Sequence, residues 1–326
     1  MMKRWLFIGP NPLSGIGQVT ARYARLVGGE YVTLFHEPKH ASYDIGFAFV
    51  LPIEQHLDWV DRTMTRCTRH MYMTVCETET VHPTYAELVR RYTHLYVPSE
   101  FCRRILERQF PHGHWSVLHH WDKAPPLPVA RPIGSDDVYT FYTIGNILDP
   151  RKNIKMLIEA FLRLKMPGTT RLVLKATCHS PVEMKIPGVE IINGLLSNED
   201  LEKVHAQCQC YVNCSHAEGV GMGAVEAALR NKPVIFSSYG GLSEYVKSPF
   251  LVDAHELVPI GKDDFLYTKD MLWGKPRLDD LIQHMRTCAT QRITSWDHTH
   301  TRTLMDGVVQ ALSNETVGVV GPAPSP

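Results

Sequence analysis

Short apolar runs alternate with amphipathic runs along the first third of the chain. Apolar, β-branched and aromatic residues gather in six runs that predict strands over residues 4–9, 31–36, 43–50, 70–77, 94–99 and 115–121. Between them, apolar residues recur every three or four positions and predict helices over residues 17–27, 55–67, 84–92 and 99–109. Ser99 is the expected N-cap of the last helix. Strands that alternate with helices predict parallel βαβ units and hence a Rossmann-like sheet.

A second series of the same kind occupies the rest of the chain. The apolar runs predict strands over residues 138–146, 171–177, 189–196, 210–215, 233–238 and 250–254. The amphipathic runs predict helices over residues 153–165, 197–208, 223–231, 241–247 and 295–312. We therefore predict an α/β protein with two Rossmann-like, doubly wound parallel-sheet domains facing a cleft.

The two series are separated by residues 123–137, which contain Pro125, Pro126, Pro128 and Pro132. Such a proline density excludes a helix or a central strand, so we expect a linker. The predicted domains are residues 1–122 and 138–293, followed by a helix over residues 294–312. Residues 313–326 lack a packing pattern and predict a disordered tail.

Composition excludes several classes of protein. The 326 residues are 44% hydrophobic, and 34 Lys and Arg balance 34 Asp and Glu, so the chain has no basic field for nucleic acid. No apolar run reaches the roughly 20 residues of a membrane helix, and the first apolar run breaks at Gly9-Pro10, too early for a signal peptide. The eight cysteines show no framework spacing, which favours reduced thiols and a cytoplasmic location.

One segment of the chain gathers cysteines and histidines, the residue types that bind zinc. Cys208, Cys210 and Cys214 lie near His205 and His216. Alternation along a buried strand explains the cysteine spacing, so we predict no metal site.

The stretch HAEGVGMGAVEAALRN, residues 216–231, carries the strongest chemical signal. It links a predicted strand to a predicted helix, and ligands of α/β proteins bind at the carboxyl ends of strands. Glu218 precedes the turn, and Glu226 lies in the first turn or so of the helix. The amino end of a helix suits phosphate, and each carboxylate suits a diol, so the stretch predicts a nucleotide-sugar site. The alternative is a glycine-rich turn with incidental surface glutamates. Three glycines would let the backbone approach the ligand closely: Gly219, Gly221 and Gly223.

A second turn of this kind lies at residues 145–161, again between a predicted strand and a predicted helix. It places Arg151 and Lys152 at the amino end of the helix, where cations oppose the helix dipole. A bound anion would offset that cost, and a solvated pair of cations is the alternative interpretation.

Together these segments resemble the retaining GT-B glycosyltransferases of glycosyltransferase family four. EGVGMGAVE, residues 218–226, is similar to the E-x7-E motif of that family. Three further segments resemble segments of that family: GNILDPRKN and GGLSEYVKSPFLVDA in the second predicted domain, and LYVPSEFCRRIL at the end of the first.

The resemblance implies a GT-B architecture, with residues 1–122 as the acceptor domain and 138–293 as the donor domain. The helix at 294–312 would cross back to the first domain. The implied activity is that of a hexosyltransferase with retention of anomeric configuration. The partners would be a UDP- or GDP-linked sugar donor and a glycan, lipid-linked or protein acceptor, with no cofactor. The chain has no D-x-D triplet, which metal-dependent transferases of the other large fold use, so we expect metal independence.

The resemblance also assigns roles to residues. Glu218 would contact the donor sugar and support the charge at its anomeric carbon, Glu226 would hold the ribose, and Lys152 would neutralise the leaving diphosphate. The remaining expected donor contacts are Gly219, Val220, Gly221 and Met222 at the phosphates, Gly194 and Leu195 near the base, and Gly15 and Gly17 under the diphosphate and acceptor.

The chain departs from the family pattern at two positions. Asn146 lies where the family has an arginine, and Arg151 is the candidate replacement. Glu77 lies where many members have a histidine near the donor sugar, and it is the third candidate catalytic residue.

These departures keep other functions open. A transferase-like domain that binds nucleotide-sugar with little or no turnover is one alternative, and a sugar-nucleotide epimerase or a phosphorylase is another. A Rossmann dehydrogenase is less favoured because no G-x-G-x-x-G follows a strand. A peripheral contact with a membrane is compatible with a lipid-linked acceptor.

Overall fold

The structure is a computed structural model that describes residues 3–125, 134, 137–178 and 180–313. The chain forms two compact units. The first holds the described residues up to Lys123, Pro259–Leu272 and Thr303 onwards, and the second holds Ala124–Val258 and Trp273–Arg302. Most of the predicted linker and the predicted tail beyond residue 313 lie outside the described residues.

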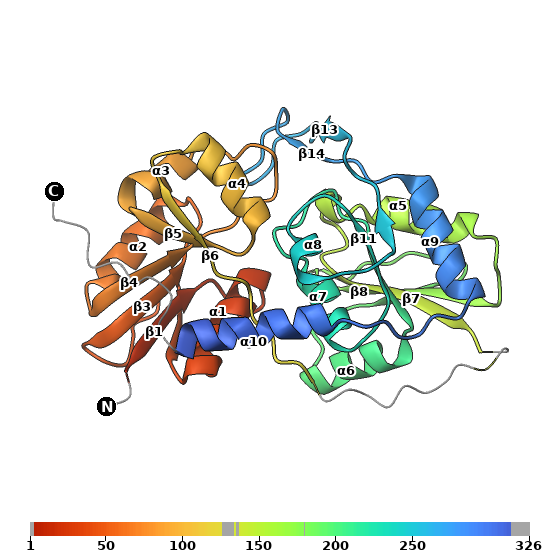
Figure 1. Ribbon diagram of the computed structural model, residues 1–326, viewed down its shortest axis with the longest axis horizontal. Coiled ribbons are helices and arrows are strands. Elements are labelled where there is room, and N and C mark those ends of the chain that lie inside the picture. Colours follow the sequence, from red (N-terminus) through yellow and green to blue (C-terminus); the bar gives the residue numbers. More distant parts are fainter. Residues whose placement is uncertain (1–2, 126–133, 135–136, 179, 314–326) are drawn as a thin grey trace. The chain divides into compact units, whose positions relative to one another are not determined.

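The first unit contains a six-stranded sheet of order β2-β1-β3-β4-β5-β6 (Figure 1). Every neighbouring pair is parallel. The strands are β1 (Trp5–Gly9), β2 (Glu30–Thr33), β3 (Tyr43–Phe49), β4 (Cys67–Met73), β5 (His94–Val97) and β6 (His114–Val117).

Helices connect these strands as βαβ crossovers. They are α1 (Gly15–Val27), α2 (Glu54–Met64), α3 (Tyr85–Arg91) and α4 (Glu100–Gln109). Ser99 caps α4 as predicted, because its hydroxyl accepts a hydrogen bond from the Cys102 amide at 3.3 Å.

The second unit contains another six-stranded parallel sheet, of order β12-β11-β10-β7-β8-β9. Its strands are β7 (Tyr139–Gly145), β8 (Thr170–Ala176), β9 (Val189–Ile192), β10 (Cys210–Asn213), β11 (Val234–Ser237) and β12 (Leu251–Val252). The helical elements that follow them along the chain are η1 (Pro150–Lys152), α5 (Ile154–Arg163), α6 (Asn198–Gln207), α7 (Met222–Leu229), α8 (Leu242–Tyr245) and α9 (Leu278–Thr290).

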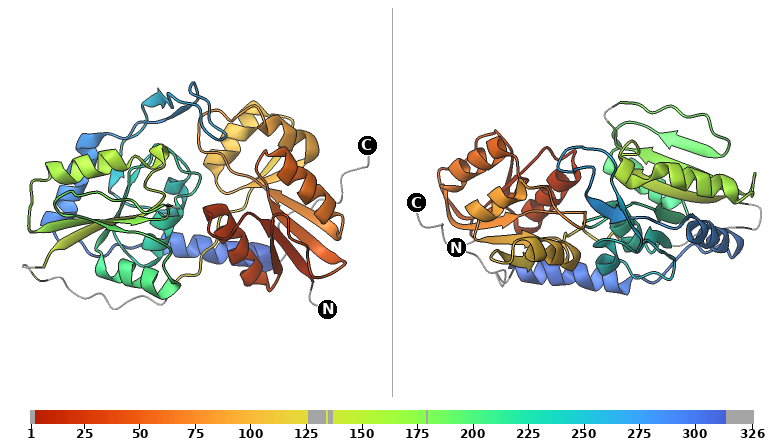
Figure 2. Two further views of the ribbon diagram at one scale, coloured as in Figure 1. Left: turned by 180° about the vertical axis from the view of Figure 1, so that it is seen from behind. Right: turned by 90° about the horizontal axis from the view of Figure 1, so that it is seen from above.

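Two further elements complete the chain. β13 (Leu257–Pro259) and β14 (Leu272–Gly274) pair as a small separate sheet. The last helix, α10 (Thr299–Ser313), carries residues of both units. Figure 2 shows the same elements from two further directions.

The strand order gives each sheet one switch point, where successive crossovers depart in opposite directions. In the first unit the chain moves from β1 to β2 on one side and then to β3 on the other. In the second unit it moves from β7 outwards to β8 and β9, and then starts again at β10 on the opposite side of β7. Ligands of open α/β sheets bind beyond the carboxyl ends of the strands at such points.

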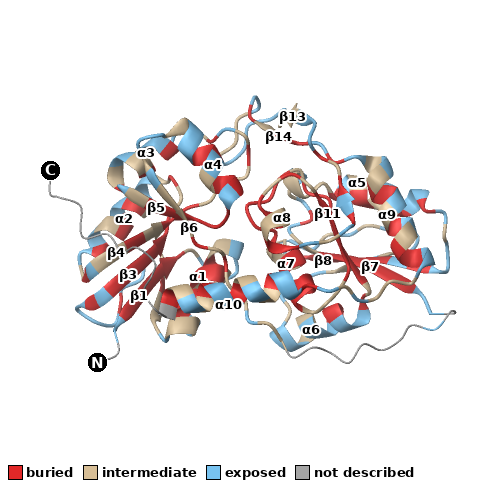
Figure 3. Ribbon diagram, viewed as in Figure 1, coloured by how far each residue is buried: buried red, intermediate tan, exposed pale blue. Residues whose placement is uncertain are grey.

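Buried strands form the core of each unit, and Figure 3 shows most of their residues as buried. Parallel strands covered on both faces carry near-continuous apolar runs, as in TFYTI of β7 and RLVLKA of β8. Aromatic rings dominate the first core: the Phe7 ring contacts the Trp5 and Phe47 rings at 5.6 and 5.4 Å between centroids.

The predicted strands and helices are present, but several strands end earlier than predicted, with β2 ending at Thr33 and β6 at Val117. Residues 74–77 after β4 and residues 193–196 after β9 form loops, although the apolar runs that predicted these strands include both segments. A polar residue follows each strand, Thr74 after β4 and Asn193 after β9. α9 was not predicted.

Candidate nucleotide-sugar site

The loops after β7 and β10 form the candidate site of the second unit. These two strands are neighbours at the switch point of its sheet, so the loops at their carboxyl ends lie side by side. The first loop carries Arg151 and Lys152 in η1, and the second carries Glu218 before α7. The structure therefore brings together three residues that the sequence placed in two separate motifs.

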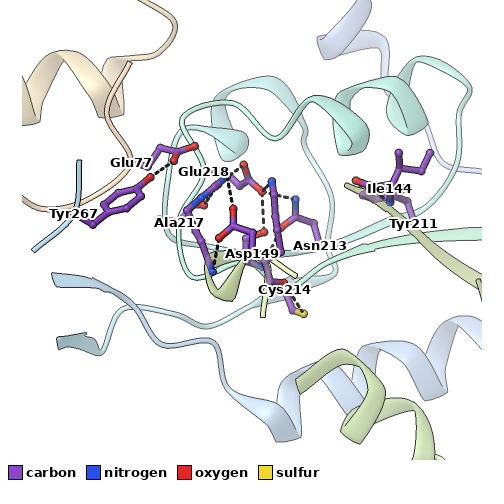
Figure 4. A network of polar contacts seen from close by, with 12 residues as sticks. Glu77, Ile144, Asp149, Tyr211, Asn213, Cys214, Ala217, Glu218 and Tyr267 are labelled. Carbon is purple, nitrogen blue, oxygen red and sulfur yellow. Dashed lines mark hydrogen bonds and ion pairs between the residues drawn. The ribbon is translucent and has the colours of Figure 1, made fainter. Parts of the chain in front are cut away.

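Glu218 is the centre of a network of polar side chains (Figure 4). The Lys152 Nζ donates to Glu218 Oε1 at 2.6 Å, and the Arg151 Nη1 donates to Oε2 at 3.0 Å. Ser215 Oγ and Asn213 Nδ2 donate to Oε1 at 2.7 and 3.2 Å. Four donors therefore fix both oxygens of one carboxylate that is only 5% exposed.

The charges of the network decide the ionisation of Glu218. Burial raises its pKa, but the charges of Lys152 and Arg151 and hydrogen bonds from Lys152 and Ser215 outweigh burial and lower the pKa to about 2. Glu218 is thus ionised at neutral pH. Because it pairs with both cations, the cost of placing them at a helix start is offset within the protein, with no need for a bound anion.

A second carboxylate and a carbonyl position the Arg151 guanidinium. Asp149 Oδ2 lies 3.3 Å from Arg151 Nη2, and the Ala217 carbonyl accepts from Nη1 at 2.8 Å. Asp149 also accepts from the Arg151 amide at 2.9 Å and so caps η1. The Lys152 ammonium has Glu218 Oε1 as its hydrogen-bond partner among the described residues, and an ammonium has three N–H donors. Lys152 can therefore turn donors towards a ligand while it holds Glu218.

Glu226 lies one helical turn inside α7, as the fifth residue of the helix, and not in its first turn. It is 7% exposed, and Glu218 is 5% exposed. Buried carboxylates are rare unless they have partners, so the alternative of incidental surface glutamates is wrong.

The turn before α7 needs glycine for its backbone. Gly221 has φ +79° and is the N-cap of α7, a left-handed conformation that glycine adopts without strain. A Cβ at Gly221 would also lie 3.0 Å from Leu242 Cδ2. Gly219, Val220 and Gly221 are buried, and Met222 is the first residue of α7. The amide groups at the start of α7 accordingly point out of the helix, the arrangement that binds phosphate.

The segment after β11 packs directly on the backbone of Glu218. The Gly241 amide donates to the Glu218 carbonyl at 2.8 Å. Gly240 has φ +115°, and a Cβ there would lie 2.6 Å from the same carbonyl oxygen. Gly240 thus permits the close contact that holds Glu218 in place.

Asn146, at the position of the family arginine, makes polar contacts within its own loop and with the loop after β8. Its Oδ1 accepts from the Leu148 amide at 3.2 Å and lies 3.1 Å from Cys178 Sγ. An amide cannot supply a positive charge, so Arg151 and Lys152 supply the positive charge in the loop after β7.

The segment predicted near the base follows β9. Gly194 has φ +81°, and Leu195 is exposed. Lys175 of β8, which is 3% exposed, donates from Nζ to the Gly194 carbonyl at 2.7 Å and to the Ala176 carbonyl. Burial lowers the pKa of Lys175. This lysine therefore anchors the segment from inside the sheet.

The glycine turn of the first unit follows β1. Ser14 is the N-cap of α1, and its hydroxyl accepts from the Gly17 amide at 3.1 Å. A Cβ at Gly17 would lie 2.2 Å from the Asn11 carbonyl oxygen, so the turn requires glycine there. Gly15 is the first residue of α1.

Glu77 lies in the loop after β4 in the first unit. Its Oε2 accepts a hydrogen bond from the Tyr267 hydroxyl at 2.5 Å (Figure 4). Tyr267 belongs to Pro259–Leu272, the part of this unit that comes late in the chain.

Sequence reasoning missed several residues of the site: Asn213, Ser215, Asp149, Gly240 and Lys175. Some had signals. Asn213 and Ser215 are polar residues at the end of the apolar run of β10, and Lys175 is a lone lysine inside the apolar run of β8. Polar residues in such positions often indicate a functional role.

Within residues 3–125, 134, 137–178 and 180–313, no group of three or more His, Cys, Asp and Glu side chains could hold a metal ion. All eight cysteines are free thiols. The helices of the described part are too short or too polar to cross a membrane.

The chain is similar to known proteins at two levels, a family model over part of the second unit and solved structures over most of the chain. Residues 139–263 match the family model described as Glycosyl transferases group 1. No curated protein matches the sequence.

Solved structures share the fold across nearly the whole chain. Anabaena HepE, crystallised with UDP and glucose, superposes with a TM-score of 0.63 at 14% identity, over 96% of this chain and 99% of that one. Sucrose-phosphate synthase from Thermosynechococcus elongatus gives 0.60 at 12% identity, over 96% and 94%. An E. coli structure described as trehalose-6-phosphate bound with UDP-2-fluoro glucose gives 0.60 at 11% identity, over 94% and 95%. The two parallel-sheet α/β units therefore have the GT-B architecture.

Proposed function

We propose that the chain is a retaining, metal-independent glycosyltransferase that moves a hexose from a nucleotide-diphosphate sugar to an acceptor hydroxyl. The observation that carries the proposal is the network at the switch point of the second sheet. Arg151, Lys152 and buried Glu218 lie there together, next to the amino end of α7.

The residues divide the binding of the donor between them. Lys152, Arg151 and the amides of Gly221 and Met222 hold the diphosphate, and Glu226 holds the ribose diol. Gly194 and Leu195 lie beside the base. Glu218 binds hydroxyls of the sugar, and its charge supports the positive charge that develops at the anomeric carbon.

The transfer step exchanges one bond at the anomeric carbon for another on the same face of the sugar. The bond from this carbon to the diphosphate oxygen breaks, and the acceptor oxygen forms the new bond. The diphosphate oxygen that leaves then takes the proton of the acceptor hydroxyl. Lys152 and the α7 amides stabilise the charge on the leaving group, which supplies the electrostatic part of catalysis.

A protein that binds the donor without turnover is the second candidate. It is favoured by Asn146, whose side chain bonds within the protein and carries no charge. Production of free sugar or glycoside from a donor would exclude it.

Thermal unfolding in the presence of nucleotides tests the donor site. A ligand at 100 times its Kd stabilises the folded state by about 2.7 kcal/mol. We expect UDP or GDP, without added metal, to raise the Tm of the wild type by several degrees and the Tm of Glu226→Ala by much less. Glu159→Ala, on the exposed face of α5, is the control and should respond like the wild type. No rise with any nucleotide diphosphate would refute the proposal.

A further inference from the structure

The first unit has a cavity of its own at the switch point of its sheet. Its volume is about 160 Å³. Ile16 lines it from the start of α1, Leu51 from just after β3, and Val75 and Glu77 from after β4. β1 and β3 flank the switch point, so the cavity occupies the position where open α/β sheets bind ligands.

The remaining wall comes from a distant part of the sequence. In Pro259–Leu272 the amide and carbonyl of Asp264 both bond to Tyr267, at 3.0 and 3.1 Å, which makes a tight turn. Leu266 lies in this turn and lines the cavity with φ +59°. Leucine is strained in this region, where glycine is not. The turn therefore retains an apolar side chain at a conformational cost.

Most polar side chains of the lining are already satisfied by the backbone. The Thr78 hydroxyl donates to the Thr80 carbonyl and the Tyr85 hydroxyl donates to the Val75 carbonyl, both at 2.6 Å. Glu77 is the lining carboxylate, and its Oε2 accepts a hydrogen bond from the Tyr267 hydroxyl at 2.5 Å. The cavity thus presents the Glu77 carboxylate among side chains that are mostly apolar.

We propose that this cavity binds the acceptor, and that the acceptor is a ring-sized apolar alcohol or phenol whose hydroxyl donates to Glu77. The inference rests on the proposed function, and it names the acceptor class. An apolar cavity of roughly 150 Å³ holds a ring the size of benzene. A free hexose fits the lining poorly, because its many hydroxyls would be buried without partners.

Tyr267 illustrates this recognition, since its own phenol is hydrogen-bonded to Glu77. An incoming hydroxyl shares or replaces this hydrogen bond. Leu266 is then a specificity-determining residue of the acceptor site.

Fluorine NMR of 4-fluorophenol with the full chain tests the inference. We expect binding to the wild type that is at least tenfold tighter than the binding of 4-fluoroanisole, which lacks the hydroxyl. Leu266→Gly should weaken 4-fluorophenol binding at least fivefold, because it removes the wall. This variant relieves the backbone strain and should fold. Glu77→Ala should bring the two probes within about twofold of each other.

Leu13→Ala is the matched control, since Leu13 is an exposed leucine of the same unit outside the cavity lining. It should bind 4-fluorophenol like the wild type. Absence of 4-fluorophenol binding, or binding that neither Leu266→Gly nor Glu77→Ala changes, would overturn the inference.

The same samples separate this inference from the proposed function. UDP and GDP are added to each, and the Tm is measured. A nucleotide response without 4-fluorophenol binding overturns the acceptor class alone. Binding of 4-fluorophenol without any nucleotide response overturns the proposed function, and with it the acceptor role of the cavity.

Discussion

Neighbouring side chains of the protein keep Glu218 ionised. As a result, the free energy of unfolding depends on pH in the acid range. Its pKa of about 2 in the folded protein lies below the ordinary value of 4.5. The folded state therefore gains stability from the Glu218 carboxylate above pH 4.5, and this gain is lost as pH falls from 4.5 towards 2.

We expect the Tm difference between the wild type and Glu218→Gln to be largest above pH 4.5 and to shrink towards pH 2. Thermal melts followed by circular dichroism from pH 2 to pH 6 measure it. Glu159→Gln, at an exposed position, is the control. A difference that stays constant over this range would contradict the assignment.

The two cations beside Glu218 differ from the other basic residues of the second unit in their position at the switch point. Arg151→Ala and Lys152→Ala should each raise the Kd for the nucleotide diphosphate about tenfold, because each removes a charged donor to the phosphates. Calorimetric titration gives the Kd values. Arg163→Ala, which removes an exposed arginine of α5, should leave the Kd unchanged. Equal affinities for all four proteins would remove both residues from the donor site.

At the scale of the element, α7 begins with a glycine that another helix restricts. Gly221→Ala forces a left-handed φ of +79° on alanine and pushes its Cβ against Leu242 of α8. We expect it to destabilise the protein by about 1 kcal/mol or more. Gly307 lies inside α10 with open space around it, so Gly307→Ala should stabilise the protein by about 0.5–1 kcal/mol. Urea unfolding compares the two, and changes of the same sign would contradict the argument.

The elements also show what sequence periodicity can and cannot predict. Amphipathic helices such as α5, and apolar strands such as β7, are predicted closely because one period covers the whole element. Residues 74–77 are not, since the apolar run continues after the strand has left the sheet. α9 carries buried Leu281, Ile282, Met285 and Cys288 at helical spacing, a signal present in the sequence.

The site was predictable in part for a similar reason. Glu218, Lys152 and Arg151 stand at the ends of predicted strands, where the topology of α/β sheets places ligands. Their mutual pairing, and the roles of Asn213 and Ser215, depend on which strands are neighbours. β7 and β10 lie about 70 residues apart in the chain and meet only in the sheet.

At the scale of the whole molecule, the chain buries nearly all of its thiols. Seven of the eight free cysteines are buried, and Cys178 is partly exposed. Burial also raises the pKa of Cys67, Cys208 and Cys214 to about 12, so they form little thiolate. We expect one fast-reacting thiol of the eight in a titration of the native protein with Ellman's reagent, and eight after denaturation. Cys178→Ser should abolish the fast phase. Two or more fast thiols would contradict the burial.

The segment Pro259–Leu272 has a consequence for how the protein is made. The strands of the first sheet have all been translated once Val117 has been added, yet the turn that walls the cavity is added roughly 150 residues later. At translation rates of about 5–20 residues per second, the interval is on the order of 10 s. During this interval the cavity around Glu77 in the nascent first unit lacks the wall that Leu266 forms, and its apolar side chains are exposed. A ribosome-associated chaperone would first have access to this incomplete form.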